Sequence, residues 1–158
     1  MIRFQKTNRG AYLNFLRAQF EAMTGQALVQ SYPYIMNIDP VSVCQLRCPI
    51  CPTGVENESK RLREPVIFRE RARLNPGCFD SLLGEVGEYL FMLMLYNWGE
   101  PLLNRDLPVF IRKAKEYQIF VEIHTNLSLR IDDAYLESIL SSGIDVIAAS
   151  IDGYMLSR

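Results

Sequence analysis

Apolar residues along the chain follow two periodicities in turn, and this alternation predicts its secondary structure. Short apolar runs have the length of strands, and Leu90 to Trp98 is nearly continuous, as in a strand buried on both faces. The expected strands are 34–39, 90–98, 119–126 and 145–153. Apolar positions at helical spacing predict helices at 78–89, 106–117 and 131–143, the first of them capped by Asp80-Ser81. Alternating strands and helices predict an α/β fold with a parallel sheet.

The first 33 residues form an extension that precedes this pattern. Residues 9–23 predict an amphipathic helix that ends at Thr24-Gly25. Its apolar stripe comprises Tyr12, Leu13, Leu16, Phe20 and Met23. We expect this stripe to pack on the main body rather than on a membrane, because Arg17 and Glu21 resemble an ordinary solvated face. The chain therefore divides into a helical extension, 1–33, and a core domain, 34–158.

Charge gives little indication of a partner. The net charge is −1, so no overall field attracts nucleic acid or an anionic membrane. Residues 56–73 are crowded with both signs of charge, which favours a solvated loop over a contact with a phosphate or an acidic substrate. With 49% hydrophobic and 22% charged residues, the composition is that of a core-forming globular protein.

Targeting signals and cysteine usage indicate the compartment. The N-terminus lacks the apolar core of a signal peptide, and the longest apolar run, 90–96, falls far short of the roughly 18 residues that span a bilayer. Three of the four cysteines are bunched, which argues against a secreted disulfide framework. We expect a soluble cytoplasmic protein.

Polar residues stand where each predicted strand ends. They are Cys44, Cys48 and Cys51 after the first strand, Asn97-Trp98-Gly99-Glu100-Pro101 after the second, His124-Thr125-Asn126 at the end of the third, and Ser150-Ile151-Asp152-Gly153 at the end of the fourth. Ligands of parallel α/β sheets gather at the carboxyl ends of the strands. We therefore expect these residues to form one site.

The three bunched cysteines suit a metal centre with an open position. A structural zinc takes four protein ligands, and disulfides need an even number of cysteines. A 4Fe-4S cluster binds one thiolate per iron, so three cysteines leave one iron for a small chelating molecule. The alternatives are a zinc knuckle completed by Cys78 or His124, and a simple iron–sulfur electron carrier, which would need no further strand-end residues. We expect Cys78 to be a small buried apolar residue.

The remaining strand ends carry groups suited to a polar ligand. Gly99 permits a close backbone approach, and Glu100 offers a carboxylate to an ammonium group, although a turn before the next helix would use the same residues. Ser150 and Asp152 share a strand face with Ala148, which is small and leaves room beside them.

Three residues at the end of the third strand have two readings each. Thr125 and Asn126 suit either a ligand or a hydrogen-bonded turn. His124 shares a face with Glu122, and we expect it to be a structural group rather than a base.

These residues resemble a known family. Cys-Gln-Leu-Arg-Cys-Pro-Ile-Cys is similar to the C-x3-C-x2-C motif of the radical S-adenosylmethionine enzymes. Residues 98–101 resemble their Gly-Gly-Glu-Pro element, 125–126 their third-strand Thr-Asn, and 150–153 their fourth-strand Ser-hydrophobic-Asp-Gly. The resemblance runs from about residue 34 to the end. The phrase Tyr-Asn-Trp-Gly-Glu-Pro-Leu-Leu-Asn suggests the SPASM branch, which carries an extra C-terminal cluster domain and includes peptide-modifying maturases.

The resemblance implies cofactors and roles. Cys44, Cys48 and Cys51 would hold three irons of a 4Fe-4S cluster, and S-adenosylmethionine would chelate the fourth. The implied cofactor-binding residues are Ile50, Gly99, Glu100, Pro101, Thr125, Asn126, Ser150 and Asp152, with Glu100 at the amino group, and Thr125 and Ser150 at the carboxylate or ribose. One electron, from a reductant such as flavodoxin or ferredoxin, would release a 5′-deoxyadenosyl radical that removes hydrogen from a peptide or small-molecule substrate. No catalytic residue is implied beyond the cluster.

The resemblance also implies a barrel. The family's (β/α) barrel has six strands, and this sequence carries about four βα units. We expect a partial barrel that forms the N-terminal part of a longer protein. The alternative is a complete chain whose sheet closes by self-association, since an open strand edge invites aggregation.

Overall fold

Four strands form a single parallel sheet. The computed structural model describes residues 9–63 and 69–151. The strands are β1 (Ile35–Asn37), β2 (Met92–Met94), β3 (Phe120–Thr125) and β4 (Val146–Ala149). They lie side by side in the order β1-β2-β3-β4, and all three pairings are parallel. The predicted α/β fold is confirmed, although the strands are shorter than the apolar runs that predicted them.

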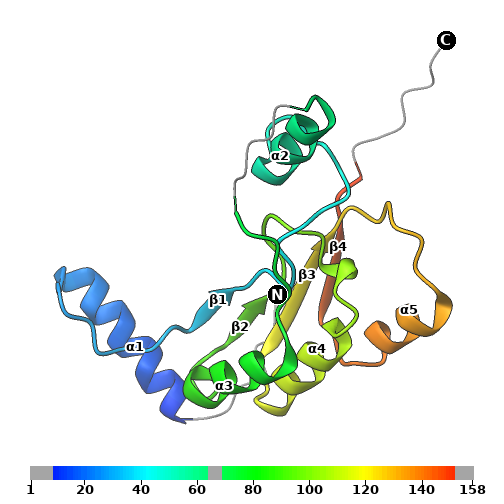
Figure 1. Cartoon of the computed structure of the whole chain (residues 1–158). Helices are drawn as coiled ribbons and strands as arrows, with labels where there is room; N and C mark the ends of the chain where they lie inside the picture. Colours follow the sequence, from blue (N-terminus) through cyan, green and yellow to red (C-terminus); the bar gives the residue numbers. More distant parts are fainter. Residues whose placement is uncertain (1–8, 64–68, 152–158) are drawn as a thin grey trace.

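Three helices connect successive strands and lie against one face of the sheet (Figure 1). They are α3 (Pro76–Val86), α4 (Leu107–Glu116) and α5 (Asp133–Leu140), and a 3-10 turn, η1 (Pro101–Leu103), precedes α4. Helix α3 begins four residues before the predicted Asp80 cap. Asn75 caps it instead, because its side chain accepts a hydrogen bond from the Cys78 N–H and Pro76 supplies a preset first turn.

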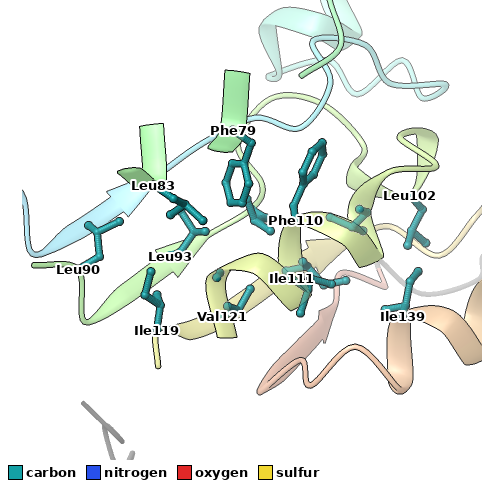
Figure 2. Packing of buried hydrophobic residues seen from close by; sticks show 14 of the residues in the cluster. Phe79, Leu83, Leu90, Leu93, Leu102, Phe110, Ile111, Ile119, Val121 and Ile139 are labelled. Atoms are coloured by element: carbon teal, nitrogen blue, oxygen red, sulfur yellow. The ribbon is translucent and has the colours of Figure 1, made fainter. Parts of the chain in front are cut away.

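The core lies between the sheet and these helices (Figure 2). Phe79 from α3 and Phe110 from α4 pack with their ring centroids 5.0 Å apart, above Leu93 of β2 and Val121 of β3. Each fully buried side chain of this size stabilises the fold by about 1.5–3 kcal/mol. Met94, on the other face of β2, is only half-buried. The prediction that this strand is buried on both faces is therefore wrong for the described residues.

Helix α1 (Arg9–Thr24) confirms the predicted helix but not the face on which it packs. Leu16 and Met23 of the apolar stripe are 61% and 87% exposed, whereas Asn14 and Glu21 are buried. The reason is local hydrogen bonding. Asn14 accepts a hydrogen bond from the Tyr32 N–H and donates one to its carbonyl, and Glu21 accepts hydrogen bonds from the segment just before Tyr32. No described helix has the length and apolar character needed to cross a membrane.

A helix that the sequence pattern did not predict follows the cysteines directly. Helix α2 (Pro52–Arg61) occupies the start of the segment expected to be a loop. Pro52 fixes its first turn, and Lys60 pairs with Glu56 one turn before it. Figure 1 shows α2 beyond the end of the sheet toward which the strands point.

Candidate functional site

A cavity of about 520 Å³ opens at the carboxyl ends of the strands. All four strand ends contribute to its lining, as the sequence predicts. The lining residues are Cys44, Leu46, Cys48, Tyr96, Asn97, Trp98, Gly99, Glu100, His124, Thr125, Asn126, Ser150 and Ile151. Seven of the predicted site residues are in this set.

Three of the other predicted site residues do not line the cavity. Cys51 is half-buried at the N-cap of α2, and Pro101 is buried at the start of η1. Ile50 is 94% exposed, so the structure does not bring it to the cavity. Asp152 lies outside the described residues.

Glu100 is a buried carboxylate held by three donors, and it is only 2% exposed. Its Oε1 accepts hydrogen bonds from the Thr125 hydroxyl at 2.6 Å and from the Leu102 N–H at 3.1 Å. Its Oε2 accepts one from the Asn126 N–H at 3.0 Å. The end of β3 therefore helps to fix the position of this carboxylate, and about one of its four lone-pair sites remains for a cation in the cavity.

Asp39, which the sequence reasoning did not select, fixes the loop after β2. Its two carboxylate oxygens accept hydrogen bonds from the backbone N–H groups of Trp98 and Gly99, at 3.1 and 3.0 Å. Arg69 pairs with the same carboxylate at 2.6 Å. Asp39 ends the first strand run as the other site residues end theirs, so its position was the signal that could have revealed it.

Gly99 is needed because of a close approach of two backbones. A Cβ at this position would lie 1.8 Å from the Val41 carbonyl oxygen. The N–H of the next residue, Glu100, donates to the Val43 carbonyl at 2.9 Å. The loop after β2 thus runs against the segment that leads into Cys44, and no side chain fits between them.

Two residues of α2 hold the loop that carries Cys44, Cys48 and Cys51 (the cysteine loop) against this helix, and sequence reasoning missed both. Asn57 donates hydrogen bonds to the carbonyls of Cys44 and Leu46, each at 2.8 Å. A Cβ on Gly54 would lie 2.2 Å from the Cys48 carbonyl oxygen, so α2 packs directly on the loop backbone. Neither contact has a local sequence signal, since each requires α2 to fold back on the loop.

The four cysteines are free thiols, but their surroundings differ. Burial raises the pKa of the Cys44 thiol, the Leu46 N–H lowers it, and the nearby Glu100 carboxylate raises it. The expectation that Cys78 is buried is wrong. It is exposed in the first turn of α3, where the Asn75 side chain contacts its sulfur at 3.3 Å. Cys78 is not among the residues that line the cavity.

His124 forms a group with two neighbours on the face of the sheet opposite the core. Its Nε2 is bonded to the Glu122 carboxylate, and its ring stacks on Tyr96 with centroids 3.8 Å apart and planes 6° apart. Burial and the Glu122 carboxylate raise the pKa of the Tyr96 hydroxyl. These contacts hold the His124 ring in place at the wall of the cavity, and its role as a structural group stays a prediction.

The chemistry of the donor set fits an iron–sulfur cluster. Thiolates are the ligands of such clusters, and two of the three thiols open into the cavity. In the part of the chain that the structure describes, no three His, Cys, Asp or Glu side chains lie close enough together to bind one metal ion. A cluster does not require that convergence, because each thiolate binds a different iron.

Two known proteins are similar to this chain in sequence. The chain is 30% identical over 107 residues to a PqqA peptide cyclase of Granulibacter bethesdensis, covering 68% of this chain and 26% of that protein. It is 27% identical over 135 residues to a 7,8-dihydro-6-hydroxymethylpterin dimethyltransferase of Methanocaldococcus jannaschii, covering 82% of this chain and 25% of that protein. These similarities support the radical S-adenosylmethionine superfamily. No family model matches the chain.

A solved structure shares the fold. The crystal structure of BtrN in complex with AdoMet and 2-DOIA superposes with a TM-score of 0.61 at 20% identity, covering 78% of this chain and 48% of that one. At this identity the likeness concerns the fold. The chain spans about a quarter of the length of the two curated relatives.

Proposed function

We propose that this chain forms the cofactor site of a radical S-adenosylmethionine enzyme. The observation that supports this most is the single cavity where the cysteine loop and the three other strand ends meet. A simple iron–sulfur electron carrier does not need a buried, oriented carboxylate beside its cluster. Glu100 is such a group, at 2% exposure.

Cys44, Cys48 and Cys51 would bind three irons and leave the fourth to S-adenosylmethionine. A carboxylate has about four lone-pair sites, and three donors already bond to Glu100, so about one site remains for the ammonium group of the cofactor. Gly99, Thr125, Asn126 and Ser150 would form the adjoining walls. We propose no contact for Ile50, which is exposed.

The bound cluster would supply one electron that splits S-adenosylmethionine into methionine and a 5′-deoxyadenosyl radical, which removes hydrogen from the substrate. The chain's own residues would position the cofactor and exclude water. We propose a peptide substrate and the SPASM branch, supported by the similarity to a PqqA peptide cyclase. The reductant we propose is a flavodoxin or ferredoxin, in a cytoplasm that keeps the thiols reduced.

The organisation that we propose follows the same resemblance. Residues 1–33 would be a helical extension, and a partial (β/α) barrel would begin at residue 34. The helices that cover one face of the parallel sheet support this proposal, because barrel strands carry their helices on the outside.

Anaerobic reconstitution tests the proposed function. We expect about four irons and four sulfides per chain, and a change in the electron paramagnetic resonance spectrum of the reduced protein when S-adenosylmethionine is added. Cys48→Ala should lose the cluster, whereas the matched Cys78→Ala should retain it. One zinc per chain without acid-labile sulfide, or loss of iron in Cys78→Ala, would overturn the assignment.

A further inference from the structure

The side-chain amide of Asn126 has only one orientation that satisfies its neighbours. Its Oδ1 accepts hydrogen bonds from the Gln45 side-chain amide at 2.8 Å, from the Ser128 N–H at 3.0 Å and from the Ser128 hydroxyl at 2.7 Å. A backbone N–H can only donate, so the atom that faces Ser128 must be the amide oxygen. The amide nitrogen therefore faces the other way.

That nitrogen faces the sulfur of Cys44. The Asn126 Nδ2 lies 3.6 Å from Cys44 Sγ, and the Leu46 backbone N–H donates to the same sulfur at 3.5 Å. In the described ranges, neither the Cys48 nor the Cys51 sulfur accepts a side-chain hydrogen bond. Cys44 is thus the one proposed iron ligand whose sulfur is contacted by a side-chain N–H donor.

The turn that carries Asn126 holds it in place. Leu127 has φ of +50°, a left-handed conformation that is rare for a bulky side chain, and its N–H donates to the Thr125 hydroxyl at 3.1 Å. The Asn126 backbone N–H donates to Glu100 at 3.0 Å. Asn126 therefore contacts both Glu100, whose carboxylate is proposed to bind the cofactor, and Cys44, whose thiolate is proposed to bind the cluster.

We propose that Asn126 is a positioning residue that raises the reduction potential of the cluster through Cys44, with Ser128 and Gln45 holding its amide. This inference rests on the proposed function. Reduction adds negative charge to a cluster, and N–H donors to its sulfurs stabilise that charge, which makes such hydrogen bonds one of the determinants of potential. By raising the potential, Asn126 would make it easier for the cluster to accept the electron that cleaves S-adenosylmethionine.

The test is a redox titration of reconstituted protein followed by electron paramagnetic resonance. Asn126→Ala should lower the midpoint potential, with the ratio of reduced to oxidised cluster falling several-fold at a fixed potential. A tenfold fall corresponds to about 59 mV for one electron. Asn126→Asp keeps the hydrogen bonds that Ser128 donates to Oδ1 and puts a carboxylate oxygen in place of the N–H that faces Cys44 Sγ, so it should lower the potential by more than Asn126→Ala. Gln26→Ala, which removes an exposed amide just after α1 and away from the residues that line the cavity, is the matched control and should titrate like the unsubstituted protein.

The outcomes separate this inference from the proposed function. An unsubstituted protein that forms no cluster overturns the proposed function. A fully loaded Asn126→Ala protein with the potential of the control overturns the role of Asn126 alone. If Asn126→Ala fails to retain iron, Asn126→Asp decides, and an unchanged potential there overturns the inference. Loss of iron from both variants also overturns it, because the hydrogen bonds would then retain the cluster rather than set its potential.

Discussion

Replacing Glu100 with glutamine would test whether the carboxylate is held by its protein contacts. The two side chains have nearly the same shape, so the substitution leaves no cavity. An amide can place its oxygen at the Oε1 position and keep the hydrogen bonds from Thr125 and Leu102. Its NH₂ group then faces the backbone N–H of Asn126, which donates to Oε2 at 3.0 Å in this structure.

The expected cost follows from that mismatch. Two donors that face each other cannot bond, and a buried N–H without an acceptor costs about 1–3 kcal/mol. The two remaining hydrogen bonds lose the strength that an ionised acceptor gives them, which brings the expected loss to about 2–4 kcal/mol. For a chain of 158 residues, this lowers the midpoint of thermal unfolding by about 4–16 °C.

Thermal and urea unfolding of the metal-free protein would measure the loss without any contribution from a cofactor. Glu137→Gln is the matched control, because Glu137 is exposed on α5 and its replacement should change stability by less than about 0.5 kcal/mol. If Glu100→Gln unfolds at the same midpoint as this control, the three hydrogen bonds do not hold the carboxylate, and our account of the site is refuted.

Two further substitutions probe the frame around the site. Gly54→Ala places a methyl group against the Cys48 backbone, which cannot rotate away. We therefore expect the free energy of unfolding to fall by about 1–3 kcal/mol and the reconstituted protein to bind less iron. The matched control is Gly84→Ala, whose methyl group meets nothing within 4 Å and which should stabilise the protein slightly. Hydrogen bonds from Ser31 and the neighbouring backbone lower the pKa of Glu21, so its stabilisation of the α1 contact is complete above about pH 4.5 and lost as the pH falls through the lowered value. The protection of the α1 amides from hydrogen exchange should fall over this pH range in the unsubstituted protein and stay constant in Glu21→Gln. Equal protection in both proteins across the range would refute this role of Glu21.

The sheet and its polar edge were predictable because they follow from short-range rules. Apolar runs separated by helical segments specify parallel strands, and parallel strands place their carboxyl ends together. Cys44, Glu100, Thr125 and Ser150 could therefore be assigned to one cavity without knowledge of any contact between them. A residue at the carboxyl end of a strand lies at this edge of the sheet whatever its neighbours are.

The supporting contacts could not be predicted in the same way. Asp39 binds backbone groups 59 and 60 residues further along the chain, and Gly54 matters only because α2 folds back onto the cysteine loop. The apolar stripe of α1 predicts the wrong inner face for this helix. Its buried Asn14 and Glu21 bind backbone N–H groups, and periodicity carries no information about such bonds.

The contacts between strand ends also explain why this part of the molecule can hold a site. Asp39 fixes the loop that carries Glu100, and Glu100 bonds to the end of β3. Asn126, at that end, reaches Cys44, and the Ser150 N–H donates to the Thr125 carbonyl at 2.9 Å. Each strand end is therefore positioned by another one, and in three of these four contacts at least one partner is a backbone group that cannot change rotamer. A ligand that needs a thiolate and a carboxylate at fixed positions would meet them already placed, so little of its binding energy would be lost to ordering the protein.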